Sequence, residues 1–577
     1  MSSSAGTLKQ PSTGGISSKS KRRVWLLVPV LIFAISAAVT EPPFMGDSRD
    51  YATEIAAIKN HQEPVAKLWE SGHPLWRPLG YIGAPGFLKL IPDRVAWTPI
   101  LKICYGLMLV NLACGAMAAL LIFDLSRRLA GNAAALIATI LFVWGDAVLA
   151  YSQSGMPYVT GLSILILGVW WQLTARSEGW LAVAGPAALF GIAALFWLPY
   201  AIAIPAACCA RRFVQVPGAG AQRMPWNRVL LSATVAGAVM AVGMGLTAIL
   251  AGVRSVPDGL AWLTAAQHGL HQNRQAVRAI TGSSRLFIEL GRDGVYLKRF
   301  LFHDPYHPVN ASSLIRYSLW KVALFYAFLV CALALAWLSK TGRRALAPLL
   351  LAGGLALPAA IAVFEPSSPE RFLPVLPFLL LAVVASWPDK RSRHGITAVA
   401  LTGVCLFAAL LPVLNWPAFA ERSSALHRRV SERLKGFRAN AGPDDAIITV
   451  MPTEPLEDVD LLVFDPLNRP KGTRLVWAVN PMSAEAARWP VRLARSVEEN
   501  WADGRNLWVE KTALGAQPAD SLLWVEGDNP DLHWRDVPIF FRSLEFDRDI
   551  GGAEGFLRIS RSQNNQERLA VMATVRP

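Results

Sequence analysis

The chain carries a series of apolar runs that an ordinary soluble protein does not contain. A helix needs about 20 mainly apolar residues to cross a bilayer. The runs therefore predict a polytopic α-helical membrane protein with about 11 spans. They lie near 24–39, 98–123, 132–151, 158–174, 179–197, 199–210, 229–252, 316–338, 345–364, 371–387 and 395–415.

Composition and charge agree with a membrane protein. The chain is 53% hydrophobic and has a formal net charge of +15, and in a chain with many spans such an excess of Lys and Arg marks the cytoplasmic loops. No basic patch with interleaved aromatic residues is present, so no nucleic-acid partner is expected. All six cysteines fall within apolar runs without a CxxC spacing, which predicts packing residues rather than disulfides.

The basic residues also predict how the chain crosses the membrane. A cluster at 19–23 precedes the first run, which is either an uncleaved anchor, the interpretation we favour, or a signal peptide with a weak cleavage-like pattern near 37–40. If 179–210 forms two short helices that break at Trp197–Pro199, the later basic clusters all fall on the cytoplasmic side. The sequence therefore predicts a multi-pass protein of the inner (plasma) membrane.

Three regions follow from this topology. Residues 1–23 are a disordered basic cytoplasmic N-terminus, and 24–415 form the membrane domain, with outer loops at 41–97 and 253–315. Residues 416–577 are far less apolar and predict a soluble extracytoplasmic α/β domain. Its predicted strands are 446–450, 460–464, 474–479, 506–510 and 521–526, with a helical pattern over 483–502.

The first outer loop carries the residues best suited to chemistry. In GDSRDY, Asp47 and Asp50 share one helix face with Glu54, beside an apolar stripe made by residues 51, 55 and 58. That pattern predicts a helix on the membrane surface with a carboxylate cluster. The same two aspartates also suit a helix start, with an N-cap and an acid at N3. The following GHPLWRPLGY is punctuated by Pro and Gly and cannot be regular helix throughout.

A second motif, EPSSPERFLPVLP at 365–377, opens a late apolar run. Together with GDSRDY and GHPLWRPLGY, it resembles GT-C-type membrane glycosyltransferases, and most nearly the bacterial protein O-mannosyltransferase-like enzymes. The resemblance covers the membrane part loosely and only these motifs residue by residue. Trp76 and Arg77 depart from the small Pro-Gly pair often found there.

The resemblance implies inverting transfer of a sugar from a polyprenyl-phosphate donor to a glycan, lipid or protein acceptor outside the cytoplasm, next to membrane lipid. It implies Asp47 as the catalytic base, with Asp50 as a second candidate. A positive side chain near the donor phosphate would stabilise the departing charge. Candidates for that role are Arg371, Arg274 and Lys298, and candidates for binding the substrates are His73, Trp76, Arg77, Tyr81, His303, His307 and Glu370.

Other interpretations remain open. The histidines of the second outer loop are poorly spaced for a metal site, so no cofactor or metal is expected. Arg371 also suits a residue that reaches the lipid headgroups. A non-catalytic transporter or assembly factor for envelope polysaccharide, with an outer domain that binds a partner, is the alternative function. The acids gather near one membrane face rather than at mid-membrane, which favours the enzyme.

Overall fold

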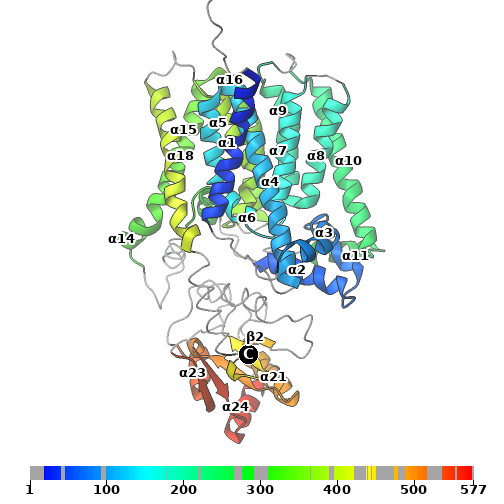
Figure 1. The fold of residues 1–577 in the computed structure, drawn as a ribbon, viewed down its shortest axis with the longest axis vertical. Helices are drawn as coiled ribbons and strands as arrows, with labels where there is room; N and C mark the ends of the chain where they lie inside the picture. The colour runs from blue at the N-terminus through cyan, green and yellow to red at the C-terminus, as the bar shows by residue number, and fades with distance from the viewer. Residues whose placement is uncertain are drawn as a thin grey trace, which may run out of the picture.

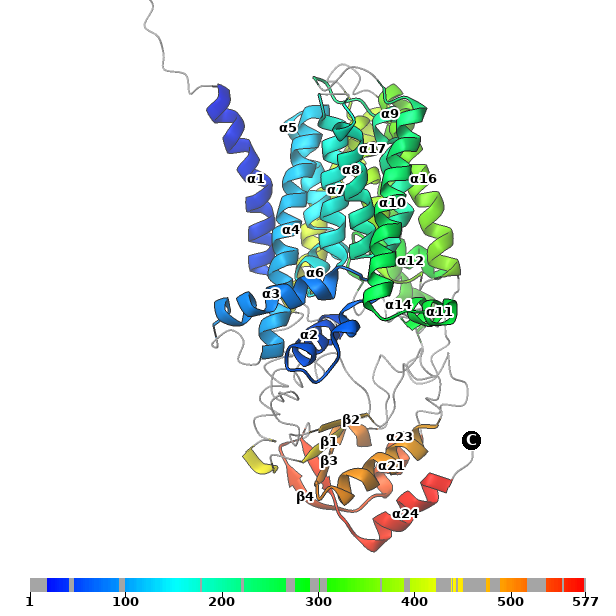
Figure 2. The ribbon, with the colours of Figure 1, turned by 90° about the vertical axis from the view of Figure 1, so that its right-hand side faces the viewer.

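The computed structural model describes a helical bundle and a small α/β domain that lies beyond one end of the bundle (Figures 1 and 2). The described residues are 18–40, 46–92, 99–176, 179–218, 223–265, 276–290, 300, 309–363, 366–388, 395–421, 437, 439–442, 445–449, 474–477, 488–515, 536–552 and 555–574.

Each apolar run of the sequence coincides with helical structure in the bundle. The fold class predicted from the sequence, a polytopic helical protein with a C-terminal α/β domain, is confirmed. The bundle consists of α1 (Ser18–Val39), α4 (Pro99–Ala130), α5 (Asn132–Val143), α6 (Asp146–Ser152), α7 (Tyr158–Thr174), α8 (Leu181–Phe196), η2 (Leu198–Ala203), α9 (Ile204–Phe213), α10 (Trp226–Leu250), α15 (Trp320–Leu338), α16 (Lys340–Ala362), η4 (Pro369–Val375), α17 (Leu376–Ala385) and α18 (Ile396–Glu421).

Fewer helices than apolar runs are long enough to cross a membrane on their own. Among the described residues, five helices are long and apolar enough, or six if the bent pair α5–α6 forms one span. The run 132–151 is not one straight helix as predicted, because α5 and α6 meet at an angle of 63°. The chain is a multi-pass membrane protein, and the number of eleven spans stays a prediction.

The predicted break within 179–210 is confirmed. Between α8 and α9 the chain forms the 3-10 turn η2, which has Pro199 near its start. The first outer loop fills this break, because Leu198 N donates to Gly72 O at 3.2 Å and Leu75 N donates to Leu195 O at 3.1 Å. Both α4 and α9 end in paired arginines, at the end of the bundle away from α2 (Gly46–Lys59) and α3 (Trp76–Leu90) (Figures 1 and 2).

A second break, between α5 and α6, is filled by the segment that follows α12 (Arg278–Ser284). The N–H groups of Asp146 and Ala147 donate to the carbonyls of Phe287 and Leu286, at 3.0 and 3.3 Å. Asn415, fully buried in α18, closes the joint. Its amide donates to Trp144 O at 2.6 Å and to Phe287 O at 2.7 Å, and it accepts from Glu289 N at 2.9 Å.

Replacing Asn415 with leucine should therefore destabilise the bundle. Buried backbone groups then lose their partners at a fully buried position, which costs about 1–3 kcal/mol for each group. We expect the thermal unfolding midpoint of the detergent-solubilised full chain to fall clearly. Leu406→Ala, at an exposed position of α18, is the control and should change little. An unchanged midpoint for Asn415→Leu would contradict the role given to this side chain.

The first outer loop forms a layer of short helices on one end of the bundle. It contains α2, the 3-10 turn η1 (Val65–Leu68) and α3, and α11 (Val256–Ala265) lies beside it. The apolar stripe of α2 is predicted to lie on the membrane surface, and this expectation is wrong. Tyr51 and Ile55 are buried in a cluster with side chains of α3 and α4, such as Trp76 and Leu107. The stripe therefore fixes α2 to protein rather than to lipid.

The C-terminal domain is built on a five-stranded sheet in the order β2-β1-β3-β5-β4. The pairs β1–β2 and β1–β3 are parallel, whereas β3–β5 and β4–β5 are antiparallel. The predicted strands at 446, 474 and 506 are confirmed, and those at 460–464 and 521–526 lie outside the described residues. The elements are β1 (Ala446–Thr449), β2 (Arg474–Trp477), α21 (Trp489–Ala502), β3 (Leu507–Glu510), η7 (Lys511–Leu514), α23 (Asp536–Ser543), β4 (Phe546–Ile550), β5 (Phe556–Ile559) and α24 (Gln563–Thr574).

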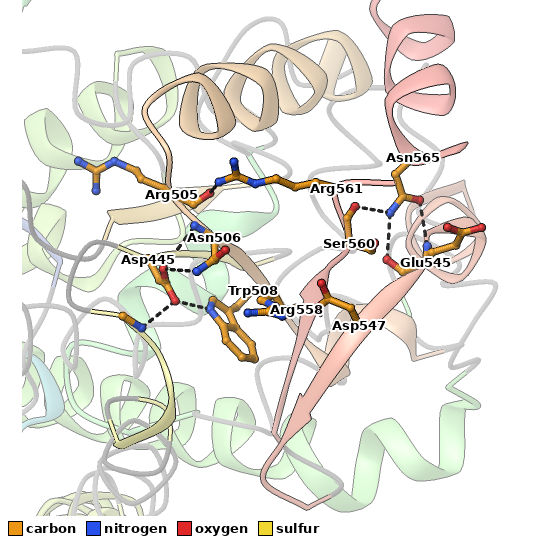
Figure 3. A network of polar contacts seen from close by, with 11 residues as sticks. Asp445, Arg505, Asn506, Trp508, Glu545, Asp547, Arg558, Ser560, Arg561 and Asn565 are labelled. Atoms are coloured by element: carbon orange, nitrogen blue, oxygen red, sulfur yellow. Dashed lines mark hydrogen bonds and ion pairs between the residues drawn. The ribbon is translucent and has the colours of Figure 1, made fainter. Parts of the chain in front are cut away.

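Two buried polar side chains tie this domain together (Figure 3). Asp445, just before β1, accepts hydrogen bonds from Trp508 Nε1 at 2.8 Å and from Asn506 Nδ2 at 3.0 Å. Asn565 of α24 donates to the carbonyls of Glu545 and Ser560, at 2.9 and 2.8 Å. These bonds join the start of β1 to β3, and α24 to the ends of β4 and β5.

Candidate functional site

Tyr158 is the centre of an aromatic cluster at the α2–α3 end of the bundle. Its ring centroid lies 4.8 Å from that of Tyr151, 4.8 Å from that of Trp197 and 6.1 Å from that of His73. Tyr51 contacts His73 edge-on at 5.6 Å. We call these five residues the aromatic cluster. They come from the first outer loop, the end of α6, the start of α7 and the break after α8.

The late motif meets this cluster through Glu370 and Arg371. Tyr151 Oη donates a hydrogen bond to Glu370 Oε2, and Arg371 Nε lies 3.6 Å from Glu370 Oε1. The Arg371 guanidinium lies 5.6 Å from the centroid of the Trp197 ring. Both charged side chains are more than nine-tenths buried within η4. A buried arginine held between a carboxylate and an aromatic ring is well placed to meet an anion.

The first motif reaches the cluster from the opposite side. Ser48 Oγ accepts a hydrogen bond from Gly155 N at 2.9 Å, and Trp76 Nε1 donates to Gly155 O at 2.8 Å. These bonds hold the first turn of α2 against the chain just before Tyr158. Asp47 lies in that first turn. Burial, with Glu70 and Asp47 nearby, holds the pKa of Tyr51 well above its usual value, so its hydroxyl stays neutral.

The two motifs therefore meet at one side chain. The Tyr158 hydroxyl lies within electrostatic range of Asp47 from α2 and of both Glu370 and Arg371 from η4. The fold brings these three charged residues together although they are far apart in the sequence. A carboxylate that can take a proton and a guanidinium that can meet an anion thus share one site.

The residues of GHPLWRPLGY divide into different roles. His73 Nδ1 lies 3.2 Å from Phe196 O, and its ring belongs to the aromatic cluster. Arg77 Nη1 pairs with Glu54 Oε2 at 2.5 Å, and Arg77 Nη2 pairs with Glu70 Oε2 at 3.2 Å. Trp76 is fully buried and supports the Gly155 turn. Tyr81 lies under Lys59, at the far end of α2 from Asp47.

Asp50 does not share the surroundings of Asp47. It is exposed and, with Glu54 and Glu70, lines a cavity of about 550 Å³. The spacing predicts one shared face, and of the two aspartates it is Asp47 that is a main electrostatic influence on the Tyr158 hydroxyl. Four other candidates lie outside the described residues: Arg274, Lys298, His303 and His307.

Sequence reasoning missed several residues of this site. Tyr151 ends one apolar run and Tyr158 begins the next. That position next to the same short loop is the one feature of the sequence that could have identified them as site residues. No pattern in the sequence identifies Arg285 as a site residue. Its Nη1 donates to Ser367 O at 3.3 Å, and it lies within electrostatic range of Asp146, Glu289 and Glu370. It joins the α5–α6 break to the late motif.

The late motif is held in place by a close contact of α12. A Cβ atom added at Gly282 would overlap the carbonyl oxygen of Pro366, just before η4. We therefore expect Gly282→Ala to push the Glu370–Arg371 turn away and to destabilise the protein by about 1–3 kcal/mol. The measurement is the thermal unfolding midpoint of the full chain. Gly353→Ala in α16, where a Cβ atom meets nothing within 4 Å, is the matched control. Equal midpoints for the two variants would count against this contact.

No protein-family model and no curated protein matches this chain. Among solved structures, ArnT from Cupriavidus metallidurans bound to undecaprenyl phosphate matches with 11% identity and a TM-score of 0.48, over 97% of this chain and 100% of that chain. The Archaeoglobus fulgidus oligosaccharyltransferase in complex with Zn and sulfate matches with 14% identity and a TM-score of 0.47, over 92% and 72% of the two chains.

The arabinofuranosyltransferase AftD from Mycobacteria matches with 14% identity and a TM-score of 0.42, over 94% of this chain and 42% of that chain. Similarity at these identities and TM-scores assigns no activity. These glycosyltransferase structures are what the chain is similar to along most of its length.

Proposed function

We propose that this protein is a membrane glycosyltransferase that moves a sugar from a polyprenyl-phosphate-linked donor to an acceptor outside the cytoplasm. One observation carries the proposal. Asp47 from the first outer loop and Arg371 from the late motif lie within electrostatic range of the same Tyr158 hydroxyl. Transfer of a phosphate-linked sugar to a hydroxyl needs a base for the acceptor proton and a cation for the departing phosphate. The site offers both.

In the proposed reaction, Asp47 takes the proton of the acceptor hydroxyl as the acceptor oxygen attacks the anomeric carbon. The bond from the anomeric carbon to the phosphate oxygen breaks on the opposite face, so the configuration inverts. The products are the glycosylated acceptor and the polyprenyl phosphate, and the proton remains on Asp47 until water removes it. A general base of this kind contributes about 10²–10⁴-fold to the rate.

Arg371 is proposed to stabilise the negative charge that develops on the departing phosphate. Tyr151 holds Glu370 by a hydrogen bond, and Glu370 in turn lies against Arg371, so the guanidinium is held before the donor arrives. A group that is already oriented loses little free energy when it meets the charge of the transition state. The polyprenyl tail would lie in the bilayer against the bundle.

The aromatic cluster is proposed to hold the donor sugar. Tyr158 is within electrostatic range of Asp47 and Arg371, and Trp197 contacts both Tyr158 and Arg371, so a sugar joined to the phosphate would meet these rings. Aromatic side chains offer apolar surface together with polar edges, which suits the faces of a sugar ring. His73 would contact the same sugar, because its ring lies between Tyr51 and Tyr158.

The orientation follows from the basic residues. The arginines at the ends of α4 and α9 lie at the end of the bundle away from α2, and basic residues prefer the cytoplasmic side. We therefore propose that the site and the C-terminal domain face the outside of an inner membrane.

The test is transfer of radiolabelled sugar from a polyprenyl-phosphate donor in membranes that contain the protein. Membranes from cells without the protein are the blank, and Glu567→Gln, on exposed α24, controls for expression. Transfer that depends on the protein and is lost in Asp47→Asn would support the proposal. Full transfer by Asp47→Asn would leave Asp47 with the role of an acid in the first turn of α2, where it favours the helix dipole. No transfer with any donor would favour a non-catalytic transporter or assembly factor.

A further inference from the structure

A cavity of about 550 Å³ lies near the proposed active site, and Arg77 in its lining contacts Tyr51 of the aromatic cluster. Its walls come from α2, the segment 66–71, the start of α3 and α11, together with Ala251 after the end of α10. Its volume is within the range of about 300–1,000 Å³ that is usual for ligand pockets. The proposed reaction uses none of the side chains that line it.

The charges of the cavity favour a ligand that is not anionic. Three carboxylates line it, from Asp50, Glu54 and Glu70, against two cations, Lys67 and Arg77. Both cations are already in ion pairs. Arg77 pairs with Glu54 and Glu70, and Lys67 pairs at 2.9 Å with Glu63, which does not line the cavity. Carboxylate oxygens therefore remain the main groups that can accept hydrogen bonds from a ligand.

The cavity also has aromatic walls. Trp69 and Trp262 both line it, and Trp262 Nε1 donates to Trp69 O at 2.8 Å. Ser71 Oγ donates to Trp262 O at 3.0 Å, which ties α11 to the first loop. Because the indole N–H of Trp262 is already used, this side chain offers the ligand apolar surface. Apolar rings beside carboxylates match a ligand with hydroxyl or amine groups around a ring that has apolar C–H faces, as a sugar has.

Tyr51 connects this cavity to the proposed active site. Arg77, which lines the cavity, holds its guanidinium 5.5 Å from the centroid of the Tyr51 ring. Tyr51 also contacts His73 of the aromatic cluster. The Tyr51 hydroxyl is buried and has no hydrogen-bond partner among the described residues, although Glu70 and Asp47 are both within electrostatic range.

We propose that this cavity binds the acceptor, as a sugar terminus that is neutral or carries an amine. This inference rests on the proposed function, because Tyr51 contacts both Arg77 of the cavity and His73 of the aromatic cluster, where the acceptor would react. Asp50 and Glu54 accept hydrogen bonds from the hydroxyl or amine groups of the sugar, and the tryptophans contact its ring. An acceptor terminus that carries a carboxylate or phosphate is rejected by the three acids.

The test measures sugar binding without any donor. The full chain in lipid nanodiscs is titrated with three disaccharides, and binding is followed by saturation-transfer difference NMR. The probes are a glucosamine disaccharide, its N-acetylated form and a galacturonic acid disaccharide. The wild type should bind the first two, and should bind the third at least about tenfold more weakly.

Two variants locate the binding. Thr53→Trp places a large side chain in the cavity and should abolish binding of all three probes. Asp50→Asn keeps the shape of the side chain and removes one charge. It should therefore weaken binding of the glucosamine disaccharide about tenfold and binding of the N-acetylated form far less. Glu567→Gln, which removes a carboxylate outside the cavity, should change neither. Unaltered binding in both cavity variants would overturn the proposal, as would tight binding of the galacturonic acid disaccharide.

The binding and transfer measurements together distinguish failure of the cavity proposal from failure of the proposed transfer activity. Binding that is lost in Thr53→Trp, in a protein that transfers no sugar, would support the cavity and count against the enzyme. If the wild type transfers sugar and Thr53→Trp leaves the KM for the acceptor unchanged, the enzyme stands and the cavity proposal fails. A tenfold or larger rise in that KM, with the KM for the donor unchanged, supports both.

Discussion

Replacing Asp47 with asparagine should reduce sugar transfer more than about a hundredfold, the scale expected when a general base is lost. Asparagine keeps the shape of aspartate, and it cannot take a proton at neutral pH. The loss should appear in kcat rather than in the KM for the donor, because the carboxylate acts on the reacting hydroxyl. Initial rates of radiolabel transfer at several donor concentrations would measure both constants.

Asp50→Asn is the matched variant three residues further along α2. Its carboxylate lines the cavity rather than the aromatic cluster, so kcat at saturating acceptor should stay within about tenfold of the wild type. The two variants together distinguish a base from a general loss of negative charge on α2. If both lose transfer equally, the assignment of the base to Asp47 is wrong.

Replacing Arg371 with glutamine should be nearly as severe. The change removes the charge proposed to face the departing phosphate, and the loss of one such interaction typically costs about 10²–10³-fold in kcat. Glutamine also leaves Glu370 without the cation beside it. We expect kcat to fall by about a hundredfold or more and the KM for the donor to rise, as measured with the same transfer assay.

Arg371→Lys and Arg343→Gln complete this experiment. Lysine keeps the charge but lacks the planar fork, so it should restore part of the activity. Arg343 is an exposed arginine near the start of α16, and its replacement should leave transfer unchanged. Full activity in Arg371→Gln would leave Arg371 with the role of a residue that merely contacts headgroups or supports Glu370.

The sequence predicts the bundle well because hydropathy is a local property. The break at Trp197–Pro199 was inferable from Pro199 together with the placement of the basic residues, and the structure has it. The bend between α5 and α6 was not inferable, since no proline marks Trp144–Gly145. That bend depends on Asn415 and on the carbonyl of Phe287, which belong to distant parts of the chain. Strands β4 and β5 were missed because charged residues interrupt them.

The candidate site was predictable only in part, for the same reason. Asp47 and Arg371 belong to sequence motifs and could be predicted as candidates. That both are near the Tyr158 hydroxyl follows from the fold and could not be predicted. Tyr151, Tyr158 and Arg285 stand in no motif, and contacts between distant segments place them. The different surroundings of Asp47 and Asp50 could not be inferred from helical spacing. Spacing predicts that two residues share a helix face, but it does not predict which neighbouring segments each of them meets.

The two filled breaks have a consequence for how the protein is made. The break after α8 is closed by residues 72–75, which are synthesised early, whereas the break between α5 and α6 is closed by Phe287 and then by Asn415, which are synthesised late. Until α18 has entered the membrane, backbone groups of the α5–α6 joint and of Glu289 lack their final partners. Assembly of the bundle is therefore completed by α18, and the α5–α6 joint of a nascent chain stays open until that helix arrives.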